Sequence, residues 1–158
     1  MVYIEDRNII LRSVDSSDID TILLWENSSA EPLYGVYEEQ YTREDVVQFV
    51  DTQQRYSIAE TEQLRLMICS HEGRRLGCVD LTEYNGVTAF VSMLIFSLSD
   101  RGKGFGTEAL SLLISYCESL GIKTLFAIIQ KENSPSKNLF EKMGFVGESS
   151  TLYRKQLR

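Results

Sequence analysis

The strand predicted over residues 87–96 constrains the fold more than any other segment of the chain. Its second half, Met93–Phe96, consists of four consecutive apolar residues and is therefore apolar on both faces. A strand of this kind lies inside a sheet that is covered on both sides. Directly after it, the hydrophobic pattern changes from a period of two to the helical period. The segment therefore predicts an α/β protein.

Other segments predict the remaining strands of a mixed sheet. Apolar, strand-like runs occupy residues 8–14, 64–70, 76–83, 124–130 and 151–157. Asn85-Gly86 predicts a hairpin between residues 76–83 and 87–96, because both residues tolerate a positive φ.

Four helices are predicted between these strands. Ser16–Asp18 offers an N-cap to the first helix, and Thr42 with Asp45 forms a capping box for the second. The third covers residues 107–120 and ends at Gly121. Ser134 and Pro135 predict the start of the fourth, which Gly144 ends. The order is β-α-α-β-β-β-α-β-α-β, in one domain over residues 1–158.

Charge and hydropathy exclude several classes of partner. Sixteen Lys and Arg against 23 Asp and Glu give a net charge of −7, which argues against nucleic-acid and anionic-membrane binding. Neither a membrane-spanning run nor a signal-peptide pattern is visible. Three scattered cysteines predict reduced, buried thiols and a cytoplasmic location. One histidine without a cysteine pair predicts no metal site.

The segment Arg101–Thr107 (RGKGFGT) carries the clearest chemical signal. Its three glycines let the backbone turn tightly and point successive N–H groups at one spot, and the following helix adds its N-terminal partial charge. Arg101 and Lys103 add full positive charges. The segment therefore predicts a phosphate or pyrophosphate site. The spacing differs from both G-x-x-x-x-G-K-[ST] and G-x-G-x-x-G, which excludes a P-loop and a dinucleotide-binding fingerprint.

These residues resemble a known family. Residues 101–106 match R-x-x-G-x-[GA], the coenzyme A pyrophosphate loop of the GCN5-related N-acetyltransferases (GNAT), and about 27 residues later residues 133–145 resemble that family's N-x-x-S-x-x-L-[YF]-E-K-x-G-F segment. Near the start, Leu11-Arg12, Trp25–Asn27 and Tyr34-Gly35 resemble the ribosomal-protein-alanine and spermidine acetyltransferase branch.

The resemblance implies a GNAT-like fold and a set of cofactor-binding residues. The sheet would be mixed and mostly antiparallel, flanked by helices, with residues 87–96 and 124–130 forming a splayed parallel pair. Pantetheine amides could pair with the backbone between them. Acetyl-CoA would be the co-substrate, bound without a metal. Its binding residues would be Leu94, Ile95, Phe96, Arg101, Gly102, Lys103, Gly104, Phe105, Gly106, Thr107, Asn133 and Ser136. Helix capping is the alternative role for Asn133 and Ser136.

The chain departs from the family pattern at the residues that move protons. Phe140 stands where many relatives carry a tyrosine thought to protonate the leaving thiolate, and Phe90 where a glutamate base is common. Asp80 and Glu83 are therefore the candidate catalytic carboxylates, with a polar strand end as the alternative role. Tyr34, Tyr37, Glu38, Glu39 and Tyr41 are expected to form a loop over the acceptor site.

The function implied by the resemblance is N-acetyl transfer. The acceptor would be a primary amine, either a small molecule such as a polyamine or a protein N-terminus, attacking acetyl-CoA directly in a ternary complex. The alternative is a coenzyme A-binding sensor or partner module without transfer activity, motivated by Phe90 and Phe140. The chain is expected to be a monomer or a homodimer.

Overall fold

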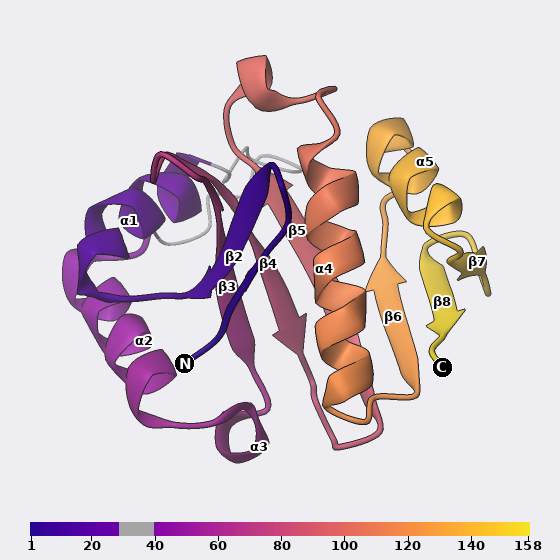
Figure 1. Cartoon of the computed structure of the whole chain (residues 1–158), viewed down its shortest axis with the longest axis horizontal. Helices are drawn as coiled ribbons and strands as arrows, with labels where there is room; N and C mark the ends of the chain where they lie inside the picture. Colours follow the sequence, from indigo (N-terminus) through magenta and orange to yellow (C-terminus); the bar gives the residue numbers. More distant parts are fainter. Residues whose placement is uncertain (29–39) are drawn as a thin grey trace.

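The computed structural model describes residues 1–28 and 40–158, and its strands form one eight-stranded sheet in the order β1-β2-β3-β4-β5-β6-β8-β7 (Figure 1). All neighbouring strands are antiparallel except β5 and β6, which run parallel. The strands are β1 (Tyr3–Glu5), β2 (Ile9–Ser13), β3 (Leu64–Ser70), β4 (Arg75–Thr82), β5 (Thr88–Ile95), β6 (Thr124–Ile128), β7 (Val146–Gly147) and β8 (Leu152–Gln156).

Helices cover both faces of this sheet, as residues 93–96 predict. One face packs against α4 (Phe105–Ser119) and Phe140 of α5 (Ser134–Lys142), which lie side by side in Figure 1. The other face packs against α1 (Ile19–Ser28) and α2 (Arg43–Arg55), with Trp25, Val46 and Val50 in the contact. Two 3₁₀ turns, η1 (Ser16–Asp18) and η3 (Leu98–Asp100), and the one-turn helix α3 (Ile58–Thr61) complete the described elements.

The predicted order of the long elements is confirmed, and their ends differ in detail. The capping box of Thr42 and Asp45 is present. In contrast, η1 is capped by Asp15, which directly precedes the predicted Ser16–Asp18 segment, and α5 is capped by Asn133 and not by Ser134. The cap of α5 therefore lies one residue earlier than predicted. Helix α4 begins at Phe105, two residues before the predicted start.

The hairpin between β4 and β5 is present, but its turn is longer than a two-residue type I′ turn. Residues 83–87 connect the strands, and the positive φ angles fall on Glu83 and Gly86. The Asn85 side chain accepts hydrogen bonds from the backbone N–H groups of Val87 and Thr88. Asn85 therefore contributes to the turn through the hydrogen bonds of its side chain and not through a positive φ.

The parallel pair is splayed, as the family resemblance implies. Strand β5 is in register with β6 only over Thr88–Phe90, whereas its pairing with β4 continues to Ile95. The two strands therefore part after Phe90 and Phe126.

A buried carboxylate holds the start of α1 against the sheet. Asp18 is fully buried and accepts hydrogen bonds from both Nη atoms of Arg12 (2.8 Å each), from Nε of Arg75 (2.6 Å) and from the backbone N–H of Asp15. Burial alone would raise the pKa of Asp18, but these hydrogen bonds lower it below the usual value.

Replacement of this carboxylate gives a test of its role in stability. Asp18→Asn should lower the free energy of unfolding at pH 7 by about 3 kcal/mol, because it leaves two guanidinium groups without their shared partner. Because the folded-state pKa is depressed, the carboxylate's contribution is present above about pH 4 and is lost as the pH falls through the folded-state value. Urea titrations at several pH values should therefore show the gap between wild type and variant narrowing below about pH 4. A gap that is unchanged by acid would contradict this account.

Candidate active site

The glycines of residues 101–107 serve two different purposes. Gly102 (φ +74) and Gly104 (φ +89) adopt the left-handed conformation, and a Cβ on either would meet nothing within 4 Å. Gly104 is also the N-cap of α4. Gly106 lies in the first turn of α4, where a Cβ would be 3.2 Å from Cδ2 of Leu139. The first two glycines therefore shape an open loop, and the third allows α4 and α5 to approach closely.

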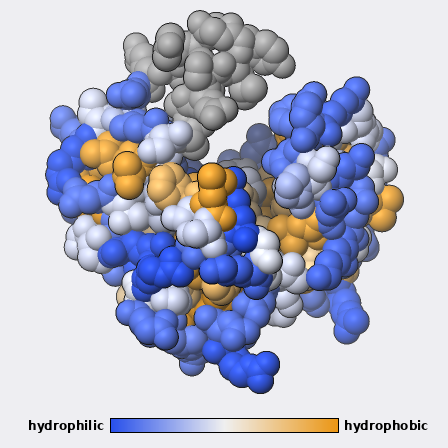
Figure 2. Space-filling view, turned by 90° about the horizontal axis from the view of Figure 1, so that it is seen from above, coloured by the Kyte–Doolittle hydropathy of each residue, from blue (hydrophilic) through white to orange (hydrophobic). Residues whose placement is uncertain are grey.

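A cavity of about 440 Å³ lies where this loop, the end of β5 and the start of α5 meet. Seen from above, the surface is hollowed between the side that carries α1 and the side that carries α5 (Figure 2). All the predicted cofactor-binding residues except Phe96 and Lys103 line this cavity. The lining residues are Met93, Leu94, Ile95, Asp100, Arg101, Gly102, Gly104, Phe105, Gly106, Thr107, Asn133, Pro135, Ser136, Leu139 and Phe140.

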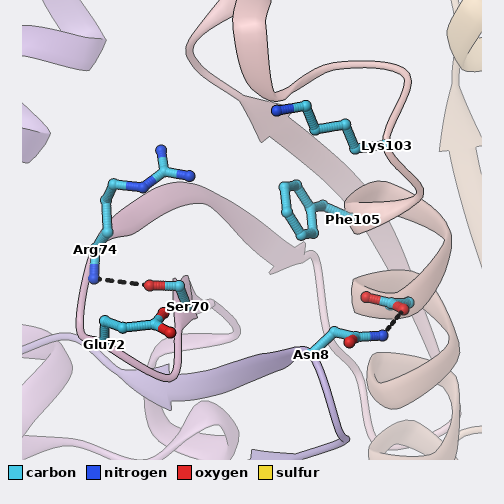
Figure 3. A pocket seen from close by; sticks show the side chains of 7 residues that line it. Asn8, Ser70, Glu72, Arg74, Lys103 and Phe105 are labelled. Atoms are coloured by element: carbon cyan, nitrogen blue, oxygen red, sulfur yellow. Dashed lines mark hydrogen bonds between the residues drawn. The ribbon is translucent and has the colours of Figure 1, made fainter.

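The two exceptions face other parts of the molecule. The ring of Phe96 packs against Trp25 with centroids 5.7 Å apart, and its backbone N–H donates to the Leu76 carbonyl. Lys103 lines a second cavity of about 600 Å³, together with Arg74 from the β3–β4 turn (Figure 3). Phe105 lines both cavities, so they adjoin at the first residue of α4.

A hydrogen bond from Arg101 and an ion pair between Arg74 and Asp100 hold the loop in place. Nε of Arg101 donates to the Ile95 carbonyl at 3.0 Å, so this guanidinium joins the loop to the end of β5. Asp100 is 4 % exposed, and its carboxylate accepts two hydrogen bonds from Arg74 at 2.8 and 3.0 Å. These bonds lower the pKa of Asp100, which therefore stays ionised at neutral pH. Arg101 therefore both binds the Ile95 carbonyl and lies on the wall of the 440 Å³ cavity.

Asn133 and Ser136 form a helix cap and also line the cavity, and their role in cofactor binding stays a prediction. The side-chain oxygen of Asn133 accepts a hydrogen bond from the Ser136 N–H at 3.2 Å, which is a helix cap. Both residues also line the cavity opposite the glycine loop. The cap therefore fixes the orientation of the polar groups at this wall.

Gly77 is important to the site and was not among the predicted residues. A Cβ at this position in β4 would lie 1.8 Å from the backbone oxygen of Leu94, which belongs to the cavity-lining part of β5. Only glycine lets the two strands keep this arrangement. The available sequence signal was a glycine inside a strand pattern, which marks a close approach of another backbone.

The contact at Gly77 makes a sharp stability prediction. Gly77→Ala should lower the free energy of unfolding by about 3 kcal/mol, because backbone atoms must move to admit the methyl group. Gly147→Ala is the matched control: it also lies in a strand, but its nearest contact would be an ordinary 3.7 Å. Denaturant titrations of the two variants measure the difference. Equal stabilities would show that the approach of Leu94 to Gly77 is not tight in solution.

The candidate carboxylates lie outside the 440 Å³ cavity. Asp80 accepts two hydrogen bonds of 2.7 Å from Arg65, which also donates to Glu26 and lies over the Phe49 ring. Glu83 is exposed and lines a smaller cavity of about 250 Å³ with Phe90 and Ser92. Among residues 1–28 and 40–158, Glu83 has no ion pair of the kind that holds Asp80, and its role as a base stays a prediction.

Phe90 and Phe140, the two residues at which the chain departs from the family pattern, pack against other aromatic rings. Phe90 stacks on Phe126 with centroids 5.4 Å apart. Phe140 is buried, contacts Phe145 edge-to-face at 4.9 Å and contributes to the wall of the 440 Å³ cavity. Neither ring carries a group that can transfer a proton. Of the expected acceptor loop, Tyr41 is exposed, and the residues before Gln40 lie outside the described part of the chain.

The cysteines are poor nucleophiles in this fold. All three are free and buried. Cys78 is in register with Leu94, next to the cavity, and burial raises the pKa of its thiol to about 12. A thiol of that pKa is protonated at neutral pH, whereas thiol nucleophiles react as thiolates.

A splayed parallel pair, a glycine loop that starts a helix and a cavity between them define a protein of the acetyltransferase type. Residues 8–146 match the Acetyltransferase (GNAT) domain family, so the chain belongs to that family. No helix in the described ranges is long and apolar enough to cross a membrane.

Curated relatives and solved structures agree with this assignment. The chain is 26 % identical over 148 residues to the spermidine N(1)-acetyltransferase of Escherichia coli. The aligned residues cover 92 % of this chain and 77 % of that enzyme. The chain is 25 % identical over 146 residues to an uncharacterised protein of Methanocaldococcus jannaschii, covering 89 % of this chain but 28 % of that protein. The chain thus spans little more than a quarter of the archaeal relative.

Among solved structures, the spermidine N-acetyltransferase of Vibrio cholerae in complex with CoA and spermine superposes with a TM-score of 0.78. It covers 94 % of each chain at 19 % identity. RimJ of Mycobacterium smegmatis in complex with CoA-disulfide gives 0.72 at 17 % identity, covering 94 % of this chain and 81 % of that one. At these identities the likeness shows the fold.

Proposed function

We propose that the chain is an N-acetyltransferase that moves an acetyl group from acetyl-CoA to a primary amine. The observation that carries the proposal is the 440 Å³ cavity, which gathers the open glycine loop, the end of β5 and the capped start of α5. The loop residues fit a pyrophosphate, because Gly102 and Gly104 leave open space where any other residue would place a Cβ. The relatives named as spermidine acetyltransferases support an amine as the acceptor.

The bound thioester would supply the acetyl group, and this chain would bind and orient it. Residues 102–106 would hold the pyrophosphate by backbone N–H groups, and Asn133 with Ser136 would face the pantetheine arm. A backbone N–H of the Leu94–Ile95 segment would polarise the thioester carbonyl, since that of Phe96 already donates to Leu76. Positioning of this kind can supply much of the rate without a tyrosine at residue 140.

The acceptor amine would react directly with the thioester. A base such as Glu83 takes the ammonium proton, and the amine nitrogen then bonds to the acyl carbon while the carbon–sulfur bond breaks. The electron pair stays on sulfur, the nitrogen releases its second proton to solvent as the amide forms, and a proton from solvent converts the thiolate to free CoA. The protonated, buried state of Cys78 supports direct transfer over a covalent acyl-enzyme.

A thiol-release assay with a panel of amines tests the proposal. Acetyl-CoA with polyamines, aminoglycosides, aminoalcohols, arylalkylamines and peptides with free N-termini should give steady CoA release with at least one acceptor. Release with none of them would contradict transferase activity.

The second candidate function is a coenzyme A-binding sensor without turnover. It is favoured by the absence of a proton-transferring group at Phe90 and Phe140, both of which pack against other rings. Calorimetry that finds tight acetyl-CoA binding, together with no turnover across the amine panel, would support it over transfer.

A further inference from the structure

The 250 Å³ cavity, which Glu83 lines, lies on the face of the sheet that α4 does not cover. Ala89, Val91, Leu125 and Ala127 of β5 and β6 are buried in the core with α4. Because side chains alternate along a strand, Phe90, Ser92, Phe126 and Ile128 lie on the opposite face. Of these, Ile128 is 63 % exposed, although α1 and α2 cover other parts of that face. We call these four residues the fork face.

The fork face marks the point where the two parallel strands part. Phe90 and Phe126 are the last pair in register, and their rings stack at 5.4 Å. Two residues further on, Ser92 and Ile128 stand on the diverging strands and line the 250 Å³ cavity. The next residues of β5, Met93 and Leu94, line the 440 Å³ cavity. The two cavities therefore meet the same stretch of β5.

The charged side chains around the 250 Å³ cavity form ion pairs with each other, with the exception of Glu83 among the described residues. Glu83 lines the 250 Å³ cavity and has no ion-pair partner among residues 1–28 and 40–158. The neighbouring charges are engaged with each other: Asp80 binds Arg65 at 2.7 Å, and Arg154, which is in register with Phe126, binds Glu148 at 2.6 Å. The described lining of the cavity thus offers one carboxylate without an ion-pair partner, next to the apolar side chains of Phe90, Val91 and Ile128 and the hydroxyl groups of Thr82 and Ser92.

We infer that the acceptor is a primary monoamine bearing an aromatic or branched apolar group, and that the fork face with Glu83 receives it. The ammonium group lies at the Glu83 carboxylate, and the apolar group lies on the stacked rings of Phe90 and Phe126 beside Ile128. A polyamine carries several charges along its length, and one carboxylate neutralises only one of them. This inference rests on the proposed transfer to an amine and names its substrate class.

Competing acceptors test the inference. With saturating acetyl-CoA, kcat/KM should be at least about tenfold higher for 2-phenylethylamine than for ethylamine or spermidine, since a buried phenyl group adds binding free energy. Ile128→Ser should lower kcat/KM for 2-phenylethylamine about fivefold through KM and change that for ethylamine less than twofold. Val146→Ser removes a similarly exposed apolar side chain from β7 and is the matched control, with no change expected for either amine.

Each outcome decides between the inference and the proposed function. Turnover that favours spermidine would overturn the inference and leave the transferase function standing. If no amine is turned over, calorimetry of the same amines against the CoA complex still tests the fork face: tight binding of 2-phenylethylamine alone supports it, and no preference overturns it. Sedimentation of Ile128→Ser that shows loss of a dimer would overturn it by assigning the face to a contact between copies.

Discussion

Gly104→Val is expected to weaken acetyl-CoA binding by about 100-fold or more. The glycine has a φ of +89 and caps α4, and space is open where its Cβ would stand. A valine there adds strain of about 1–2 kcal/mol and places two methyl groups in the space proposed for the pyrophosphate. The fold should survive, because the side chain meets no protein atom within 4 Å at its Cβ. Calorimetric titration with acetyl-CoA measures the loss.

Gly121→Val is the matched control for this variant. Gly121 also has a positive φ (+82) with open space at its Cβ, but it follows α4 at the opposite end of the helix. It should show a similar loss of stability and unchanged acetyl-CoA affinity. Arg101→Ala should weaken binding less than Gly104→Val, because the backbone N–H groups of the loop remain. Wild-type affinity in Gly104→Val would rule out the loop as the pyrophosphate site.

Glu83→Gln is expected to lower the transfer rate at neutral pH by about 10²–10⁴-fold, the usual size of a general-base contribution. The Kd for acetyl-CoA should stay near the wild-type value, since Glu83 lies outside the 440 Å³ cavity. Activity should recover in part at high pH, where the free amine is already present. The melting temperature should change little, because the side chain is exposed and unpaired among the described residues. Glu118→Gln, on α4, is the matched control.

Asp80→Asn separates a base from a structural carboxylate. Its carboxylate holds Arg65 by two hydrogen bonds, so the amide should lower the melting temperature, whereas Glu83→Gln should not. A residue that only binds the ammonium group would raise the acceptor KM with little change in kcat. Wild-type pH–rate profiles for both amide variants would remove both carboxylates from the mechanism.

The long elements of the fold were predictable because their hydrophobic patterns are local. The helices around Val46 and Leu113 and the strand that contains Met93–Ile95 lie where the sequence predicts them. The short strands β1 and β7 and the single turn of α3 have two to four residues each, too few to show a period. Their pairing depends on neighbours such as β2 and β8 that are fixed only in the folded chain.

The candidate site was predictable where it follows a contiguous motif. Residues 101–107 and 133–136 carry recognisable spacing, and all of them except Lys103 and Ser134 line the 440 Å³ cavity. The contacts that Arg65 makes with Asp80 and Glu26 could not be predicted, because Arg65 is 15 residues from Asp80 and 39 residues from Glu26 in the sequence. The contact of Gly77 with Leu94 and that of Phe96 with Trp25 likewise arise only from packing.

A single-turnover experiment with acetyl-labelled acetyl-CoA tests the central claim most directly. Enzyme in excess is mixed with the labelled thioester and an accepted amine, quenched at intervals, and the label is separated into thioester, acetylated amine and protein. Direct transfer predicts that the label passes to the amine with one CoA released per acetylated amine and that no protein label accumulates. It also predicts that Gly104→Val forms product far more slowly than the wild type under the same conditions. Label on the protein, or bound thioester that is never consumed, would contradict the account.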